Sequence, residues 1–431
     1  MSKTRKITVN ALTRVEGEGS LHVRVDGDVV EDVRLNIYEP PRFFEAFLRD
    51  RSIEEVPDIT ARICGICPVA YQMTSVHAME SALGIAVTPE VRQLRRLLYC
   101  GEWIESHALH IFMLNAPDFF DCDSGIELAK MFPDHVQAGL QIKQAGNSIL
   151  EILGGRAIHP VNVRIGGFHR MPSCSELNTL LSPLQSALDA AVKAADWIEQ
   201  FEFPTLEIAC ELVAVRHPEE YAMNEGVIAS NRYPSIHAAE YERHFLEDQV
   251  AHSTALHSSR REHDTPYFVG PLARLTLNRN RLFPTARSVA DRTYPIAEVH
   301  NRFRSIQARI IEVIHSLEEA IAIIRAYQFS ANPSMPYQPK SGWGCAVTEA
   351  PRGLIYHAYE ITDDGLVKAS KIVPPTSQNQ RQIETDLHNL LPPLLQDDDQ
   401  TIAMQCEKLI RCYDPCISCS THFLTLNLDR R

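Results

Sequence analysis

The sequence predicts a mainly α-helical protein with a smaller β component, an α+β chain whose core is a bundle of long helices. Several long segments repeat apolar residues at intervals of three and four, which is the period of a buried helix face. Two other regions, one near each end of the chain, alternate apolar and polar residues as strands do. The 431 residues are 45% hydrophobic and 23% charged, which is enough apolar material for a large core.

The chain begins with predicted strands. Residues 5–38 alternate apolar and polar side chains in KITVNAL, SLHVRVD and VVEDVRLNI, and Gly27-Asp28 separates the last two of these runs. A glycine beside an aspartate favours a tight turn between paired strands. We therefore expect a small N-terminal antiparallel sheet.

From about residue 68 to residue 330 the pattern is mostly helical. Several long helices in one chain favour a bundle, because each helix must bury its apolar stripe against others. The segments with the clearest helical period are 75–85, 91–114, 136–153, 176–201 and 303–327.

The C-terminal part returns to strands and then to helix. Residues 353–373 alternate on both sides of Asp364-Gly365, which predicts a hairpin. Residues 380–411 predict an interrupted helix that leads directly into a cysteine-rich segment. Repeats, low-complexity segments and linkers are lacking, so residues 1–431 are expected to form one domain.

Composition narrows the classes of function. The formal net charge of -13 and the lack of long basic runs argue against a general nucleic-acid surface. The sequence has neither an apolar run of membrane-spanning length nor a hydrophobic segment behind its charged start, so we expect a cytoplasmic protein without a membrane span. Its 11 cysteines should then be reduced, which favours metal ligation over disulfides.

Four cysteines form two CxxC pairs, Cys64 with Cys67 and Cys416 with Cys419. This spacing lets two sulfur atoms converge on one ion. Structural zinc sites usually hold their pairs within roughly 12 to 20 residues of each other, whereas these pairs lie near opposite ends of the chain. A structural zinc site and an ordinary iron-sulfur cluster both remain possible from the residues alone.

The sequences around these pairs, RICGIC and DPCISCSTH, together resemble those of the large, catalytic subunit of nickel-iron hydrogenases. The resemblance covers most of the chain and implies the nickel-iron hydrogenase large-subunit fold. Further matching segments are RVEGEG (14–19), PRFFEAFL (41–48), GGRAIHP (154–160) and EAPRGLIYH (349–357).

The resemblance implies which metal each of the four cysteine thiolates binds. In that family the four cysteines bind nickel, and the second cysteine of each pair also bridges to an iron that carries carbon monoxide and cyanide. Cys64 and Cys416 would then be terminal nickel ligands, and Cys67 and Cys419 would be the bridging ones. Soft thiolates suit this chemistry because they stabilise electron-rich nickel and can accept a proton.

Three further residues take catalytic roles by the same resemblance. Glu16 matches a glutamate that passes protons outward from a terminal thiolate, although on the residues alone a solvated surface position is favoured. Arg352 matches an arginine poised over the metals, and its alternative is an ordinary salt bridge. Asp414, directly before the second cysteine pair, would be the counter-ion of this arginine.

The resemblance also implies a second metal ion and a processing step. Glu45, the main-chain carbonyl of Lys371 and His422 would hold a magnesium or iron ion, although Glu45 alone fits an ordinary amphipathic helix. Residues 423–431 resemble a C-terminal extension that a maturation protease removes after nickel insertion. Their alternating pattern alone would predict an edge strand.

Two departures from the common family pattern indicate which branch of the family this sequence resembles. Tyr71 stands where many members have a histidine, and Pro375 stands where many have a serine. Neither change removes a metal ligand. With the lack of a targeting segment, they favour the soluble cytoplasmic branch whose partners pass electrons to NAD(P).

The expected reaction is the reversible heterolytic cleavage of H₂ into electrons and protons. The electrons would pass to an iron-sulfur small subunit and then to flavin-containing NAD(P) diaphorase subunits. One alternative is the large subunit of a coenzyme F420-reducing hydrogenase. Others are a non-catalytic relative such as the quinone-site subunit of respiratory complex I, and a structural zinc protein.

Overall fold

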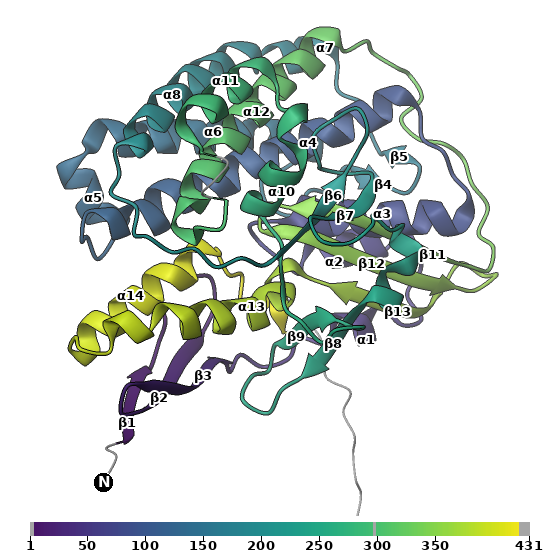
Figure 1. The fold of residues 1–431 in the computed structure, drawn as a ribbon. Coiled ribbons are helices and arrows are strands. Elements are labelled where there is room, and N and C mark those ends of the chain that lie inside the picture. The colour runs from purple at the N-terminus through teal and green to yellow at the C-terminus, as the bar shows by residue number, and fades with distance from the viewer. Residues whose placement is uncertain (1–3, 296–298, 422–431) are drawn as a thin grey trace, which may run out of the picture.

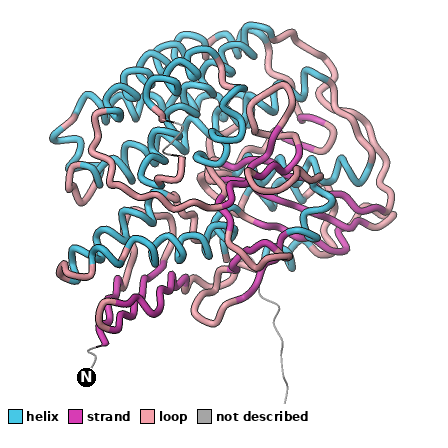
Figure 2. Tube along the Cα trace, viewed as in Figure 1, coloured by secondary structure: helices cyan, strands magenta, loops and turns pink. Residues whose placement is uncertain are grey.

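Most of the long helices of the computed structural model lie together on one side of the molecule, and most of the strands lie on the other (Figures 1 and 2). The structure describes residues 4–295 and 299–421. Within these ranges a large hydrophobic core runs through the helices and into the sheets and includes all four CxxC cysteines, and a second, smaller core is separate from it. No helix in the described ranges is both long enough and apolar enough to cross a membrane.

Five long helices match the helical segments that the sequence predicts; the last four pack on one another as the bundle, and the first packs mainly on strands. The side chain of Thr88 caps the second of them by accepting from the Val91 N–H, and the third ends at Gly155 with a φ of 83°. Nearly every residue of the last helix is buried, so it forms the centre of the bundle. The five helices are α3 (Pro68–Leu83), α4 (Pro89–Leu109), α6 (Pro133–Gly154), α8 (Leu181–Glu199) and α12 (Ser305–Ala326).

The predicted N-terminal sheet is confirmed. Strands β1 (Thr4–Val9), β2 (Gly19–Asp26) and β3 (Val29–Ile37) pair antiparallel in the order β1-β2-β3. Gly27 makes the turn with a φ of 62°, which few other residues adopt without strain.

The C-terminal hairpin is also confirmed, as β12 (Gly353–Ile361) and β13 (Val367–Val373). A strand that the sequence pattern did not predict, β11 (Gly342–Ala350), pairs with β12 to complete a three-stranded sheet. Helices α13 (Pro375–Leu390) and α14 (Asp399–Cys412) follow, and α14 ends shortly before the second cysteine pair.

The expectation of a mostly helical segment from 68 to 330 was incomplete, because short strands interrupt it. Strand β6, for example, is an almost wholly buried run, ELVAVR, and periodicity alone cannot distinguish such a run from helix. The strands are β4 (Val163–Arg164), β5 (Gly167–Phe168), β6 (Glu211–Arg216), β7 (Val227–Ser230), β8 (Phe245–Gln249), β9 (Leu256–Arg260) and β10 (Tyr267–Phe268).

Shorter helices connect these parts. They are α1 (Phe44–Leu48), α2 (Val56–Ala61), α5 (Gly125–Met131), α7 (Cys174–Asn178), α9 (Tyr241–His244), α10 (Pro271–Asn278) and α11 (Pro284–Thr293). A π-helical turn, His110–Asn115, and a 3₁₀ turn, Ala116–Phe119, continue α4 beyond the end of its regular helix.

Candidate metal centre

The two CxxC pairs meet in the centre of the fold. The Sγ atoms of Cys64 and Cys67 are 2.9 Å apart, those of Cys416 and Cys419 are 2.8 Å apart, and those of Cys64 and Cys416 are 3.6 Å apart. All four residues are at most 5% exposed. The fold therefore brings the four predicted thiols to one buried point.

Each pair sits in a tight turn at the end of a helix. Cys64 follows α2, and its Sγ accepts from the Cys67 N–H at 3.2 Å, which closes a turn just before α3 begins at Pro68. Cys416 follows α14, and Cys419 lies in the short 3₁₀ helix η8 (Ser418–Ser420). These turns explain why the CxxC spacing directs both sulfur atoms of a pair to one side.

The four thiols lie so close together that each affects the ionisation of the others. Burial raises the pKa of the Cys419 thiol well above its usual value. Burial also acts against ionisation of Cys64, but hydrogen bonds from the other three thiols and the charge of Arg352 hold the pKa of Cys64 well below its usual value. The neighbouring thiols and Arg352 therefore favour the ionised form of Cys64.

Glu16 lies against the second pair. Its Oε2 accepts from Cys416 Sγ and from the Ser418 N–H, both at 3.1 Å, and its main-chain carbonyl accepts from the Ile417 N–H at 2.9 Å. Gly17 follows with a φ of 91°, and a Cβ there would come within 2.7 Å of the Ile417 side chain. The glycine of the RVEGEG motif thus permits the close approach that brings the carboxylate to the thiol.

Arg352 and Asp414 form a buried pair beside the thiols. Arg352 Nε donates to the Asp414 carbonyl at 2.8 Å, and its Nη2 donates to the Asp414 Oδ1 at 3.2 Å. Both residues are at most 4% exposed. Burial acts against the charge of Arg352, but Asp414 and the nearby cysteines outweigh it and raise the pKa of the guanidinium. Its Nη1 is buried without a hydrogen-bond partner among the described residues.

The proposed second ion site is only partly described. Glu45 Oε1 accepts from the Ile372 N–H at 2.7 Å, so this carboxylate lies at the main chain of β13, next to Lys371. Burial raises the pKa of Glu45 to about 8, and the Lys371 ammonium offsets only part of this effect. That ammonium is paired with Glu247. The third expected ligand, His422, and residues 423–431 lie outside the described residues.

The two departures from the family pattern also lie near the thiols. Tyr71 is fully buried on α3, and burial, followed by the charges of the four cysteines, raises the pKa of its phenol well above the usual value. The phenol therefore stays neutral next to the thiols. Pro375 is the first residue of α13, and the hydroxyl of the next residue, Thr376, accepts from the Cys416 N–H at 3.0 Å.

Sequence reasoning missed Glu102, which supports the first pair. Its buried carboxylate accepts from the Val69 N–H at 2.6 Å and from the Ala70 N–H at 3.1 Å, so it caps the start of α3 directly after Cys67. In the sequence Glu102 is one polar residue within a helical pattern, without a motif to distinguish it. Thr376 also lacks a motif, and it lies before residues 380–411, which the sequence predicts as helix.

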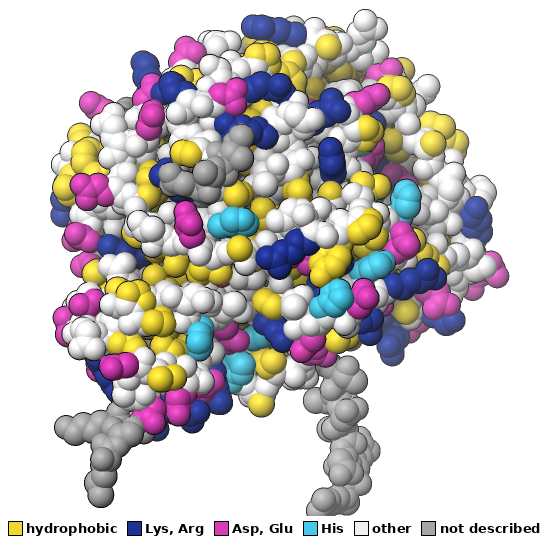
Figure 3. Space-filling model, viewed as in Figure 1, with side chains coloured by type: hydrophobic (Ala, Val, Ile, Leu, Met, Phe, Trp, Pro, Cys, Tyr) yellow, Lys and Arg dark blue, Asp and Glu magenta, His cyan; other side chains and the backbone are white. Residues whose placement is uncertain are grey.

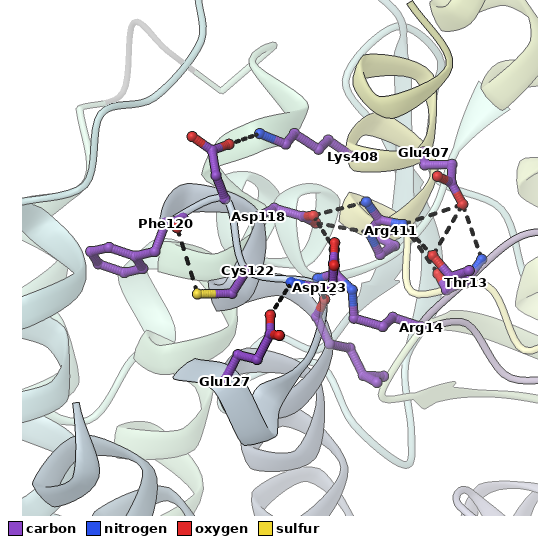
Figure 4. A network of polar contacts seen from close by, with 12 residues as sticks. Thr13, Arg14, Asp118, Phe120, Cys122, Asp123, Glu127, Glu407, Lys408 and Arg411 are labelled. Carbon is purple, nitrogen blue, oxygen red and sulfur yellow. Dashed lines mark hydrogen bonds and ion pairs between the residues drawn. The ribbon is translucent and has the colours of Figure 1, made fainter. Parts of the chain in front are cut away.

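A second missed carboxylate, Asp118, joins the segment of Glu16 to the segment of Cys416 (Figure 4). Arg14 donates to Asp118 Oδ1 at 2.6 Å. Arg411, on α14, donates to both carboxylate oxygens at 2.8 and 2.9 Å and also to the Thr13 carbonyl at 3.1 Å. One buried carboxylate thus holds together the two stretches of chain that carry Glu16 and Cys416.

The donor set fits a nickel-iron centre. Four buried thiols supply soft ligands, and the unpartnered Arg352 Nη1 beside them supplies a donor for an anionic group. Among the described residues, histidine, cysteine and carboxylate ligand atoms gather at this thiol cluster and at two further places that contain no sulfur.

Known proteins place this arrangement in a family. A sequence model described as "Nickel-dependent hydrogenase" matches residues 42–132 and 215–422. Sulfhydrogenase 2 subunit alpha of Pyrococcus furiosus is 33% identical, with 97% of this chain and 100% of the relative covered. Sulfhydrogenase 1 subunit alpha of the same organism is 31% identical, with 97% and 98% covered.

A more distant relative and a solved structure support the same family. NAD-reducing hydrogenase HoxS subunit beta of Cupriavidus necator is 23% identical, with 98% of this chain and 95% of the relative covered. The crystal structure of an NAD⁺-reducing NiFe hydrogenase in the H₂-reduced state superposes with a TM-score of 0.90 at 26% identity, covering 98% of this chain and 100% of that chain. The chain therefore belongs to the nickel-dependent hydrogenase family and has the fold of its large subunit.

Proposed function

We propose that this large subunit catalyses the reversible heterolytic cleavage of H₂ at a nickel-iron centre held by Cys64, Cys67, Cys416 and Cys419. The observation that carries the proposal is the convergence of the four buried thiols with a carboxylate in hydrogen-bond contact with one of them. When bound by these residues, a nickel-iron pair with carbon monoxide and cyanide on the iron would supply electron-rich metals for the cleavage of H₂.

Cys416 and Glu16 provide the proton route in this proposal. The Cys416 sulfur holds the proton released by cleavage, and Glu16 Oε2, at 3.1 Å, is close enough to accept it. Cys416 is 1% exposed, whereas Glu16 is half-buried. The carboxylate therefore lies between the buried thiols and the surface of the molecule. Transfer in the opposite direction serves H₂ formation.

Arg352 places a positive charge and one available N–H donor beside the thiols. In this proposal the arginine orients and polarises a group that is bound there. Asp414 holds two of its donors, which leaves Nη1 for a group bound near the thiols. A buried guanidinium favours negative charge at that point, because little water is present to screen it. Asp414 therefore acts by positioning Arg352 rather than by touching the reacting atoms.

We propose NAD(P) as the final electron acceptor, reached through an iron-sulfur small subunit and flavin-containing diaphorase subunits. Support comes from the relative named NAD-reducing hydrogenase and from the similarity to an NAD⁺-reducing NiFe hydrogenase structure. Coenzyme F420 is the alternative acceptor, although a relative from Methanococcus voltae carries the name F420-non-reducing hydrogenase. A cytoplasmic location is part of the same proposal.

Glu45, the Lys371 carbonyl and His422 are proposed to hold a magnesium or iron ion. The position of the Glu45 carboxylate at the main chain of β13 supports the first two ligands. An oxygen-rich donor set with water completing the shell suits a hard cation.

We also propose that a maturation protease removes residues 423–431. The family match stops at residue 422, and the chain is still buried at Thr421, whose carbonyl accepts from the Arg42 N–H at 2.8 Å. Burying a further segment that ends in two arginines would be costly. Active enzyme should therefore end at His422 by intact mass, and full-length mass with full activity would refute the processing step.

Single thiol substitutions test the central proposal. Cys64→Ser and Cys416→Ser should abolish H₂ uptake, because a hydroxyl is a harder and much less acidic ligand than a thiol. Cys174→Ser, at an exposed cysteine, is the matched control and should keep uptake. The assay uses the native complex with NAD⁺ and with NADP⁺ as acceptors. Wild-type turnover by either ligand variant would refute the assignment.

A further inference from the structure

A second candidate ligand cluster lies on the β8–β9 hairpin and α13, outside the thiol site. His252 follows β8, His257 lies on β9, and Glu384 lies on α13. One potential ligand atom from each residue lies within 4.8 Å of the others. The two imidazole rings are 5.4 Å apart and nearly perpendicular, at 88°.

The cluster is more than an exposed ion pair. His252 Nε2 is 2.8 Å from Glu384 Oε1, and His257 Nδ1 is 3.8 Å from Glu384 Oε2. Glu384 Oε1 also accepts from the Leu35 N–H at 2.8 Å, which fixes the carboxylate in place. His257 is only 5% exposed, and its Nε2 is buried without a hydrogen-bond partner among the described residues. A single carboxylate thus lies close to one nitrogen of each imidazole. The other nitrogen of His257 has no hydrogen-bond partner among the described residues.

An ion could reach this point from the surface. His252 lines two surface hollows, one of about 540 Å³ against Asn36–Tyr38 and one of about 410 Å³ over the N-terminal sheet. Histidine side chains are exposed on the lower half of the face drawn in Figure 3, where the N-terminal sheet and the β8–β9 hairpin lie. Water from either hollow can complete a coordination shell.

We infer that His252, His257 and Glu384 bind a divalent first-row transition metal ion, with zinc as the probe ion. Imidazole nitrogen suits zinc, nickel, copper and iron, whereas magnesium and calcium prefer oxygen ligands throughout. Three protein ligands leave at least one position for water. The inference does not depend on the proposed hydrogenase activity.

The ion would fasten the β8–β9 hairpin to α13. The same helix begins at Pro375, and the hydroxyl of its second residue, Thr376, accepts from the Cys416 N–H. Glu384 lies two helical turns further along. A metal at the cluster therefore stabilises the helix that supports the second cysteine pair, without taking part in the chemistry at the thiols.

Zinc binding to the full-length chain tests the inference by calorimetry and metal analysis. Glu384→Gln and His252→Ala should weaken zinc binding by at least about ten-fold, because each removes a ligand. His388→Gln is the matched control. It lies one turn further along α13, hydrogen-bonds the Val30 carbonyl at 3.1 Å and should leave zinc affinity unchanged. Thermal unfolding without zinc checks that each variant folds.

X-ray absorption at the zinc edge separates this site from the four thiols. Nitrogen and oxygen neighbours at about 2.0–2.2 Å with imidazole scattering support the site, whereas sulfur neighbours at about 2.3 Å report zinc on the cysteines. The inference is overturned if zinc shows only sulfur neighbours, if it does not bind, or if the ligand variants bind it as tightly as wild type.

Discussion

Glu16 and Cys416 are distant in sequence, yet the sulfur and the carboxylate oxygen are in hydrogen-bond contact. The contact depends on a glycine beside Glu16, because a Cβ at Gly17 would collide with Ile417. At the scale of single residues, the proposed proton route thus rests on a few side chains whose distances are set by the main chain around them.

Glu16→Gln tests the proton route. The amide keeps nearly the same shape but cannot relay a proton, so the variant should retain nickel while H₂/D₂ exchange with solvent falls by roughly 10²- to 10⁴-fold. Glu18→Gln is the matched control, since Glu18 is an exposed carboxylate in the same motif. Unchanged exchange in the Glu16 variant would move the proton route elsewhere, and reduced exchange in the control would point to Glu18.

Arg352→Lys tests the oriented guanidinium. A lysine keeps the charge and has three donors, but all three are on one nitrogen, so it cannot reproduce the planar arrangement in which Nε and Nη2 bind Asp414 and Nη1 remains available. H₂ oxidation should fall by at least about 100-fold with the nickel content unchanged. Turnover near the wild-type rate would show that charge alone is sufficient at this position.

The four cysteines could be identified from sequence because each pair carries its own local motif. Glu102 and Thr376 could not, since their roles arise from contacts with Val69, Ala70 and Cys416 that only the folded chain creates. A carboxylate in the middle of one helix that caps the start of another leaves no periodic signal of this role in the sequence. Their positions were therefore a finding of the structure.

At the scale of elements, Asp118 joins the segment before Glu16 to α14 (Figure 4). Its neighbours explain why its role was not predicted. The helix expected to end at residue 114 continues instead through a π-helical turn and a 3₁₀ turn, and Asp118 lies in the latter. Long amphipathic helices were predicted correctly, but irregular turns and the short strands β4–β10 were not, because they have too few residues to show a period.

Asp118→Asn should destabilise the protein by about 2 to 4 kcal/mol, because Arg14 and Arg411 lose a buried counter-ion. The matched control is Asp121→Asn. Its carboxylate is 82% exposed and pairs with Lys408, so the change should cost about 1 kcal/mol or less. Urea unfolding of both variants checks this difference, and equal stability losses would contradict the assigned role of Asp118.

At the scale of the whole molecule, the bundle contains buried titratable groups in and directly after α4 and in α12. Burial lowers the pKa of His107 to about 4 and that of His110 to about 3. Burial acts against the charge of Glu312 and Glu319, but their arginine and histidine partners outweigh it and lower each pKa to about 2. The sequence indicated helices here but not which polar residues face one another across them.

These shifts predict lower stability in acid. The unfolded chain takes up protons near pH 6.5 on histidine and near pH 4.3 on glutamate, whereas the folded chain resists protonation until lower pH. On these groups the unfolded state therefore binds more protons, so they make stability fall as the pH drops below about 6.5, whereas Glu45, whose pKa burial raises to about 8, acts in the opposite direction. His110→Gln removes one of these histidines, so the urea midpoint of the variant relative to wild type should be higher at pH 5 than at pH 7.5. The same difference between variant and wild type at both pH values would contradict the lowered pKa of His110.

The infrared spectrum of the H₂-active native complex tests the central claim most directly. A nickel-iron centre on the four cysteines predicts cyanide and carbonyl stretching bands that accompany stoichiometric nickel and disappear in Cys419→Ser. Zinc in stoichiometric amount, without nickel and without these bands, would contradict a nickel-iron centre at the four thiols.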